Sequence, residues 1–252
     1  MADLHGTVAL ITGAGRRIGR AIALVLAQAG ADVVLHVNTS SAEAVRGEIS
    51  QLGRQAWVLP ADLSQPDAVR RLVDEAVEAA GRIDILVNNA AIFFHTPVAT
   101  LGCADWQRTL RMNLSAPFLL SLLVGRNMYQ QGRGKIIFLG DWSGQRPSPE
   151  FLPYCVSKSG VHALTHALAK AFAPYVQVNE IAPGPVLVPE EYSAQERAQV
   201  RKNTPLQRFG DPQDVARVVR FLAESGDFVT GATYGVDGGW LAKGAGGSGT
   251  SL

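Results

Sequence analysis

The chain has 252 residues, of which 47% are hydrophobic, enough to fill the core of one large α/β domain. Its 23 basic and 22 acidic side chains leave a net charge of +1, so no overall field attracts nucleic acid or an anionic membrane. These values exclude nucleic acid and membranes as expected partners. They favour a protein that holds a small molecule through local groups.

Cys103 and Cys155 are far apart and lie outside any C-x-x-C or Cys/His spacing, so neither a disulfide nor a metal site is expected. The first residues contain no basic segment followed by an apolar run and a cleavage site. No apolar run reaches membrane-spanning length. We therefore expect a cytoplasmic protein.

Short β-branched segments alternate with longer amphipathic segments through most of the chain. The strand-like segments are residues 8–12, 33–37, 56–59, 83–87, 135–139 and 176–181. Helical spacing of apolar residues marks 20–29, 42–52 and 67–80, which end near Gly30, Gly53 and Gly81. The alternation predicts a Rossmann-like α/β fold, a doubly wound parallel sheet between two helical layers, three layers in all.

No repeat or linker divides the chain, so residues 1–242 are predicted to form a single domain. The Gly/Ser-rich residues 243–252 are predicted to form a flexible tail. Residues 185–210 show no clear sheet pattern, and 193–202 within them are expected to form a polar helix. We expect this stretch to act as a lid over the site.

Ligands in a doubly wound sheet bind outside the carboxyl ends of the strands. Gly13, Gly15 and Gly19 lie between the first strand and its helix, where backbone amides and a helix N-terminus can approach a diphosphate. A tight turn without a ligand is the alternative. Other motifs at predicted strand ends are Asn88-Asn89-Ala90, Gly140-Asp141 and Ala182-Pro183-Gly184.

Tyr154 and Lys158 are four residues apart and share one face of a helix. A tyrosine has a reference pKa of about 10, so it exchanges protons near neutrality only if a cation stabilises its phenolate. We therefore expect Lys158 to lower the pKa of Tyr154. Coincidental surface placement of the pair is the alternative.

The spacing from Thr12 to Gly19, the Asn88-Asn89-Ala90 run, Asn113, the Tyr154/Lys158 pair and Pro183-Gly184 together resemble the short-chain dehydrogenase/reductase family, from about Gly6 to Leu241. The resemblance implies a dinucleotide-binding catalytic domain with a nicotinamide cofactor, a water relay at Asn113 and a homotetramer. Asp62 would contact the adenine, or cap the following helix, or both. The expected cofactor contacts are Gly13, Arg16, Arg17, Ile18, Asn38, Thr39, Ser40, Asp62, Leu63, Asn89, Ala90, Lys158, Pro183 and Gly184.

The end of the second strand bears on the choice between NADH and NADPH. A carboxylate there would accept the ribose 2′-hydroxyl of NAD, but Asp32 lies at the opposite end of the strand. Arg16, Thr39 and Ser40 can instead donate to a 2′-phosphate, which favours NADPH. An ordinary solvated charge is the alternative for Arg16.

Asp141 stands thirteen residues before Tyr154, where the wider family has a serine. An ionised aspartate only accepts hydrogen bonds and would repel a developing alkoxide. It can accept from the N–H groups of a nitrogen heterocycle or, when protonated, deliver a proton to a ring nitrogen. Alternatively, Ser143 donates the hydrogen bond to a carbonyl oxygen that the family serine would donate, and Asp141 only caps a loop.

Asp141, Tyr154, Lys158, the arginine at 17 and residues 88–97 resemble the pteridine reductases within that family. The resemblance implies that Phe93 stacks on a flat heterocycle and that Arg17 reaches both substrate and cofactor phosphates. A plain core position is the alternative for Phe93. The chain departs from the subgroup by lacking an arginine or histidine just after the second strand, and Trp142 and Trp240 would make its pocket more aromatic.

These patterns predict an NADPH-dependent reductase that transfers a hydride to a C=N bond of a pterin. The expected catalytic residues are Asn113, Asp141, Tyr154 and Lys158, and the expected substrate contacts are Arg17, Phe93, Asp141, Trp142 and Tyr154. A reductase of another cyclic imine or of a ketone is the alternative, and a nucleotide-sensing protein without turnover is a third reading. In a homotetramer Val161, Leu164 and Leu168 fit an interface and the core equally well.

Overall fold

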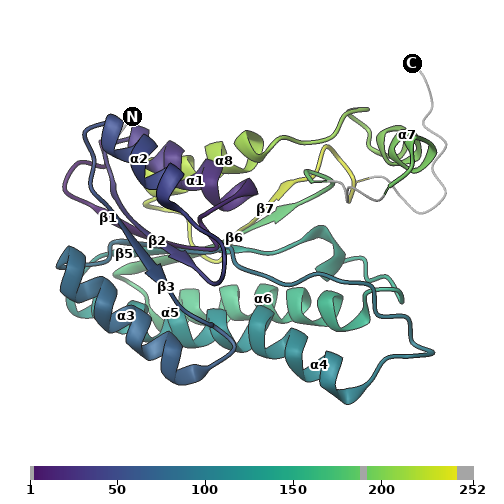
Figure 1. Cartoon of the computed structure of the whole chain (residues 1–252), viewed down its shortest axis with the longest axis horizontal. Coiled ribbons are helices and arrows are strands. Elements are labelled where there is room, and N and C mark those ends of the chain that lie inside the picture. The colour runs from purple at the N-terminus through teal and green to yellow at the C-terminus, as the bar shows by residue number, and fades with distance from the viewer. Residues whose placement is uncertain (1–2, 188–191, 243–252) are drawn as a thin grey trace.

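The computed structural model describes residues 3–187 and 192–242, and the predicted tail lies outside them. A single domain is built on a seven-stranded parallel sheet in the order β3-β2-β1-β4-β5-β6-β7, with helices on both faces (Figure 1). The strands are β1 Val8–Thr12, β2 Asp32–Val37, β3 Ala56–Pro60, β4 Ile85–Asn88, β5 Gly134–Leu139, β6 Val176–Pro183 and β7 Thr233–Val236.

Helices α1 (Arg17–Gln28), α2 (Glu43–Gln51) and α8 (Pro212–Ser225) cover one face of the sheet. Helices α3 (Pro66–Ala80), α5 (Ala116–Gln130) and α6 (Leu152–Ala171) cover the other, with α4 (Cys103–Leu110) beside them. Two short helices, η1 (Arg111–Ser115) and η2 (Trp142–Gly144), follow α4 and β5. Cys103 is exposed, Cys155 is buried, and both are free thiols.

Both faces of the sheet are buried, which explains the unbroken apolar strands in the sequence. In β1, Ala9 and Ile11 belong to the core under α1, α2 and α8, whereas Val8 and Leu10 belong to the core under α3, α5 and α6. The doubly wound three-layer fold predicted from the sequence is therefore confirmed. No helix within residues 3–187 and 192–242 is long and apolar enough to cross a membrane.

Several elements differ from the predictions. Helix α1 begins at Arg17 rather than at residue 20, and β4 begins at Ile85 rather than at residue 83. Asp84 lies just before the strand, where its carboxylate accepts from Val8 N, 3.0 Å away. Strand β7 was not predicted, since it is short, contains Gly235 and is only half-buried at the sheet edge.

Helix α7 (Ala194–Asn203) confirms the polar helix predicted over 193–202. Ser193 Oγ accepts from Glu196 N, and the Glu196 carboxylate accepts from Ser193 N, which is a complete capping box. No residue of α7 is buried, and the helix stands apart from the two core layers (Figure 1). A role for α7 as a lid remains a prediction.

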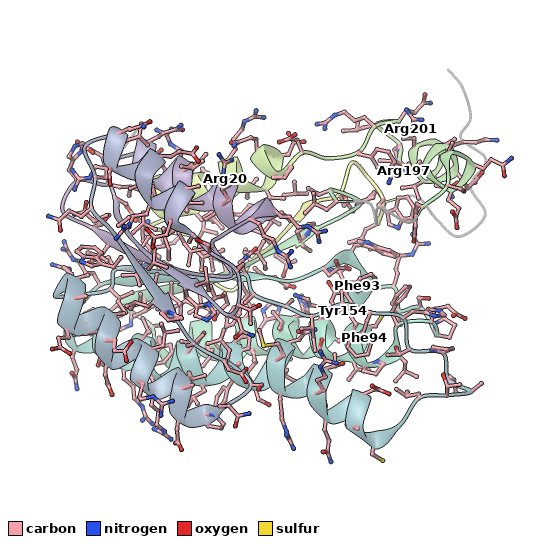
Figure 2. All side chains as sticks on the ribbon, in the orientation of Figure 1. Arg20, Phe93, Phe94, Tyr154, Arg197 and Arg201 are labelled. Atoms are coloured by element: carbon pink, nitrogen blue, oxygen red, sulfur yellow. The ribbon has the colours of Figure 1, made fainter. Side chains whose placement is uncertain are left out.

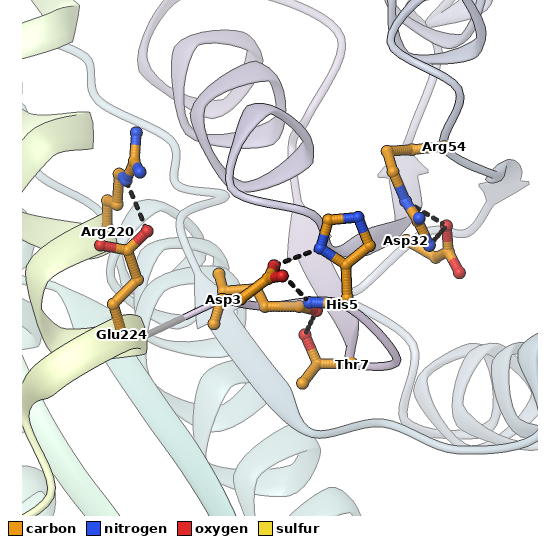
Figure 3. Close-up of polar contacts among 8 residues, drawn as sticks. Asp3, His5, Thr7, Asp32, Arg54, Arg220 and Glu224 are labelled. Atoms are coloured by element: carbon orange, nitrogen blue, oxygen red, sulfur yellow. Dashed lines mark hydrogen bonds and ion pairs between the residues drawn. The ribbon is translucent and has the colours of Figure 1, made fainter. Parts of the chain in front are cut away.

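Asp32 lies at the start of β2, far from the carboxyl ends of the strands, as the sequence predicted. Its Oδ1 accepts two hydrogen bonds from the guanidinium of Arg54, from Nε at 3.0 Å and from Nη2 at 2.7 Å (Figure 3). Asp32 is thus occupied by an ion pair at the end of the sheet opposite the glycine-rich turn.

Candidate active site

Side-chain hydrogen bonds connect the end of β4 to the glycine-rich turn that follows β1. Thr12 Oγ1 accepts from the backbone N–H groups of Asn89 and Ala90, both at 2.9 Å. Asn89 Nδ2 donates to Thr12 O at 2.7 Å and to Gly13 O at 3.3 Å. The structure therefore gives Asn89 and Ala90 a role in shaping the turn, while their contact with a cofactor stays a prediction.

His36 is a residue of this site that the sequence analysis missed. Its Nε2 lies 3.0 Å from Ala61 O and donates to it, and its Nδ1 accepts from Gly13 N at 3.2 Å. Burial lowers the pKa of His36, which keeps the ring neutral in this tautomer. The signal in the sequence was a lone polar ring inside the apolar β2 strand.

We expect His36→Leu to destabilise the protein, because the variant leaves Gly13 N without an acceptor. The free energy of unfolding should fall by about 1–3 kcal/mol in urea titrations at pH 8. His5→Leu is the matched control, since His5 is exposed. As the pH falls below 6.5, protonation of the unfolded chain should destabilise wild type but not His36→Leu. Equal stabilities for the two leucine variants would contradict the role of His36.

The turn after β1 has the features that a dinucleotide diphosphate requires. A Cβ on Gly15 would lie 2.7 Å from Ser41 O and 3.3 Å from Ser40 Oγ, so the turn and the end of β2 approach closely. Arg16 is the N-cap of α1 but its side chain caps no N–H, and the first turn of α1 carries no acidic residue. The N-terminus of α1 is thus open to an anion.

Arg17 adopts a backbone conformation that only glycine adopts easily. Its φ is +52°, in the left-handed region, and its side chain is exposed. This conformation costs about 1 kcal/mol for a non-glycine residue. Arg16, Asn38, Thr39 and Ser40 are also exposed, and Ile18 is half-buried. The turn and the end of β2 therefore carry exposed polar and cationic groups, and their contact with a phosphate stays a prediction.

Asp62 does not cap the following helix, so that alternative was wrong. Helix α3 has Gln65 as its N-cap, and Asp62 Oδ1 instead accepts from Ser64 N at 2.9 Å within a local turn. This backbone hydrogen bond lowers the pKa of the exposed Asp62 carboxyl. The side chain of Leu63 is buried in the core, which leaves only its backbone for a ligand.

Asp141 and Tyr154 meet at the carboxyl end of β5. Tyr154 Oη donates to Asp141 Oδ2 at 3.1 Å, and Ser143 N donates to Asp141 Oδ1 at 2.8 Å. Asp141 therefore caps η2 and contacts the tyrosine at the same time. Burial raises the pKa of Asp141 above its usual value of 3.8, against the lowering effect of the Ser143 and Tyr154 hydrogen bonds and of the Lys158 charge.

The expectation that Lys158 lowers the pKa of Tyr154 was wrong for this geometry. Lys158 Nζ donates to Leu139 O at 2.7 Å and lies 5.6 Å from the centroid of the Tyr154 ring. Burial raises the pKa of Tyr154 well above 10, and the charge and hydrogen bond of Asp141 raise it further. Burial lowers the pKa of Lys158, while the charges of Asp141 and Glu180 oppose that shift.

Asn113 lies in η1 and is almost fully buried. Its Oδ1 accepts from Ile92 N and its Nδ2 donates to Ile92 O, both at 2.9 Å. These two bonds hold the segment after β4 in place beside the site.

At the end of β6, Gly184 N donates to Val236 O at 3.0 Å, and a Cβ on Gly184 would collide with Asp237.

Aromatic rings lie against Tyr154 and next to Asp141 in the chain. Phe93 is 52% exposed, so a plain core position for it is wrong. Its ring stacks on Phe151 at 4.5 Å and meets the ring of Tyr154 edge-on at 4.8 Å. The ring centroids of Trp142 and Trp240 lie 5.4 Å apart. Figure 2 shows Phe93 beside Tyr154, with Arg197 and Arg201 of α7 above them.

Ser143 is the nearest hydroxyl side chain in sequence to Asp141. It is buried, and its Oγ has no hydrogen-bond partner within the described part of the chain. A buried hydroxyl without a partner is uncommon and costs free energy. Ser143 therefore has an unused hydrogen-bonding capacity close to the carboxylate.

The fold and this site define an oxidoreductase of the Rossmann type. The family model described as "Enoyl-(Acyl carrier protein) reductase" matches residues 13–241. A 3-oxoacyl-[acyl-carrier-protein] reductase of Synechocystis is 37% identical, over 96% of this chain and 99% of its own. The chain therefore belongs to the short-chain dehydrogenase/reductase family.

Two solved structures support a nicotinamide dinucleotide as the cofactor. A 7α-hydroxysteroid dehydrogenase complexed with NADH and 7-oxo glycochenodeoxycholic acid has a TM-score of 0.90 and 33% identity, covering 94% of this chain and 95% of that one. A blue fluorescent protein from a metagenomic library, in complex with NADPH, has a TM-score of 0.88 and 33% identity, covering 94% and 99%. None of these three relatives is named as a pteridine reductase.

Proposed function

We propose that the protein is an NADPH-dependent reductase of a pterin C=N bond. The observation that carries the proposal is the hydrogen bond between Tyr154 Oη and Asp141 Oδ2, which joins two acids at the carboxyl end of β5. The nicotinamide supplies the hydride when it is bound. The carbon of a C=N bond accepts that hydride, and the nitrogen then needs a proton.

Tyr154 and Asp141 are suited to deliver that proton. The raised pKa of Tyr154 keeps its hydroxyl protonated, and the raised pKa of Asp141 brings its carboxyl closer to the range in which it can act as an acid. An ionised Asp141 can instead accept from the amino and N–H groups of the pterin. Lys158 contributes a positive charge next to the tyrosine ring.

The walls of the site favour a flat substrate. Phe93 is half-exposed and stacked on Phe151, so one face of its ring pair is available to a heterocycle. Trp142 and Trp240 add further aromatic surface. The guanidinium of Arg17 can stack on such a ring and bind a phosphate, which matches its place on the turn.

The direct test is oxidation of NADPH by purified protein with dihydrobiopterin or dihydromonapterin, compared with a panel of simple ketones and repeated with NADH. Pterin reduction with NADPH and little ketone activity would support the proposal. Ketone reduction without pterin activity would contradict it. A strong preference for NADH would contradict the assignment of Arg16, Thr39 and Ser40 to a 2′-phosphate.

A ketone reductase is the second candidate, because the buried Ser143 Oγ has no partner among the described residues and would donate to a carbonyl oxygen if a substrate reached it. The relatives named above include a 3-oxoacyl reductase and a dehydrogenase solved with a 7-oxo steroid. Ser143→Ala separates the candidates. We expect it to leave pterin turnover within about threefold of wild type, while a ketone reductase that depends on this hydroxyl should lose about 10²-fold in kcat.

We also propose that the protein assembles through α6. A hollow of about 360 Å³ lies between the segment at Leu114–Phe118 and α6, lined by Leu114, Ser115, Phe118, Gly160, Ala163, Leu164 and Ala167. Val161 and Leu168 face the core instead, so only Leu164 of the three expected positions fits an interface. Sedimentation velocity tests the expected homotetramer, and a monomer at all concentrations would contradict it.

A further inference from the structure

A second carboxylate is buried behind the candidate active site. Glu180 lies in β6 opposite Phe138 of β5, and only 2% of its surface is exposed. A glutamate is almost never fully buried unless it is paired. The proton transfer described above does not use Glu180, so its position needs a separate explanation.

Glu180 is held by two donors on its Oε2. Thr233 Oγ1 of β7 donates at 2.7 Å, and His162 Nδ1 of α6 lies at 2.9 Å. Because the Thr233 proton is committed to Glu180, a bond from His162 to the ionised carboxylate requires the proton of the ring on Nδ1. The side chain of His162 is 41% exposed, and its ring packs on the exposed His166 at 4.7 Å. Two donors on one oxygen fit a charged carboxylate.

The carboxylate of Glu180 occupies the space of a missing side chain. A Cβ built on Gly140 would collide with Glu180 Oε1. Gly140 follows Leu139, whose carbonyl accepts from Lys158 Nζ, and precedes Asp141. Glu180 therefore lies directly behind the backbone that anchors Lys158 and carries Asp141. Only glycine at position 140 permits this approach.

Lys158 is one helical turn before His162 on the same face of α6. Two carboxylates favour the charged form of Lys158, Asp141 more strongly and Glu180 second, against the effect of burial. The groups that face Glu180 are thus Lys158 and His162 on α6, Thr233 on β7 and the Gly140 backbone after β5, with His166 beyond His162. Lys158 is the only charged group of these that also borders the Asp141/Tyr154 pair.

We propose that Glu180 is a positioning residue that keeps Lys158 cationic at the Leu139 carbonyl, with His162 and Thr233 holding the carboxylate in place. The inference rests on the proposed function in one respect, that the reaction needs a charged Lys158. Within the described part of the chain Glu180 hydrogen-bonds to neither the tyrosine hydroxyl nor Asp141, so its effect on the site is assigned to the charge of Lys158.

The test is the titration of the Lys158 side chain by NMR of protein labelled in its lysine side chains, in wild type and Glu180→Gln. Glutamine has nearly the same shape but no charge. We expect Lys158 to lose its proton about one pH unit lower in the variant. Lys158→Met assigns the signal, and Lys135, Lys170 and Lys202 are internal controls. An unchanged titration of Lys158 would overturn the inference.

Two further variants keep the test independent of folding effects. Glu224→Gln removes another buried carboxylate, which is paired with Arg220 at 2.7 Å on α8 (Figure 3), and it should leave the Lys158 titration unchanged. Gly140→Ala should displace the Glu180 carboxylate and shift Lys158 in the same direction as Glu180→Gln. In a Glu180→Ala background, which makes room for the new methyl group, Gly140→Ala should add no further shift.

The enzymatic readout separates this inference from the proposed function. With an active substrate, the step of the pH profile of kcat that reports loss of the Lys158 proton, distinct from any step set by Asp141, should move to lower pH in Glu180→Gln by the same interval as the NMR titration. A shifted NMR titration without pterin reduction would support the role of Glu180 and reject the pterin substrate. Pterin reduction with an unshifted NMR titration would do the reverse.

Discussion

Replacing Asp141 with asparagine is expected to reduce pterin turnover by about 10²- to 10⁴-fold, the contribution typical of a general acid. Asparagine keeps one oxygen that can accept from Ser143 N, and its Nδ2 can donate to Tyr154 Oη, so the loop and the tyrosine should stay in place. What the variant loses is the exchangeable proton and the charge. The dissociation constant of NADPH, measured by fluorescence titration, should change by less than about twofold.

The direction of the pKa shift makes the same variant informative about stability. The pKa of Asp141 is higher in the folded state, so its favourable contribution is present below pH 3.8 and is lost as the pH rises through the folded pKa. At neutral pH the Asn variant avoids this loss and should be at least as stable as wild type. Asp227→Asn, at an exposed carboxylate, is the control. Unaffected turnover in Asp141→Asn would reject Asp141 as a catalytic residue.

A protonated Asp141 as the acid also predicts a pH profile. Turnover of wild type should fall as the pH rises through the raised pKa of Asp141, because the proton is then lost. If Asp141 acts only as an ionised acceptor, turnover should fall on the acidic side instead. The direction of this limb, measured with NADPH and pterin at saturation, decides between the two roles that the sequence left open.

The sequence was sufficient for the fold because the information is local and repeated. Buried parallel strands require continuous apolar runs, and six of them are long enough to recognise. Strand β7 lacks this signal, since it depends on pairing with β6 across a long separation in sequence. The positions of Tyr154, Lys158 and Asp141 at one sheet edge followed from the same topology.

The hydrogen-bond partners and pKa shifts of the site could not be predicted from the spacing of its residues in the sequence. Tyr154 and Lys158 share a helix face, but the tyrosine hydroxyl bonds to Asp141 and the lysine bonds to Leu139 O. The direction in which the pKa of Tyr154 shifts depends on those partners and on burial. Neither can be predicted from the spacing of residues in the sequence. His36 and Glu180 were missed for a related reason, because their partners come from other strands and helices.

Arg17 shows a conflict between local and functional requirements. The backbone has a φ of +52°, which glycine adopts without strain, although the residue is arginine. The site therefore carries a strained residue whose side chain is exposed at the cofactor turn. Strain retained at such a place is a reason to infer a binding role for the side chain.

Arg17→Gly is therefore expected to change stability and activity in opposite directions. Glycine adopts the left-handed conformation without strain, which should add up to about 1 kcal/mol to the free energy of unfolding, reduced by the greater freedom of glycine in the unfolded chain. The KM for the pterin and the dissociation constant of NADPH should both rise by about tenfold or more, since the loss of a charge-assisted hydrogen bond costs about 1.5–3 kcal/mol.

The matched control is Arg20→Gln, one turn further along α1, where the guanidinium pairs with Glu48 at 2.7 Å rather than facing the turn. It should leave both binding constants within about twofold of wild type. Unchanged pterin and NADPH binding in Arg17→Gly would contradict the assignment of Arg17 to the site, because a glycine would then serve there at lower strain. Weaker binding in Arg17→Gly would instead explain why this chain keeps a strained cation where a glycine would be more stable.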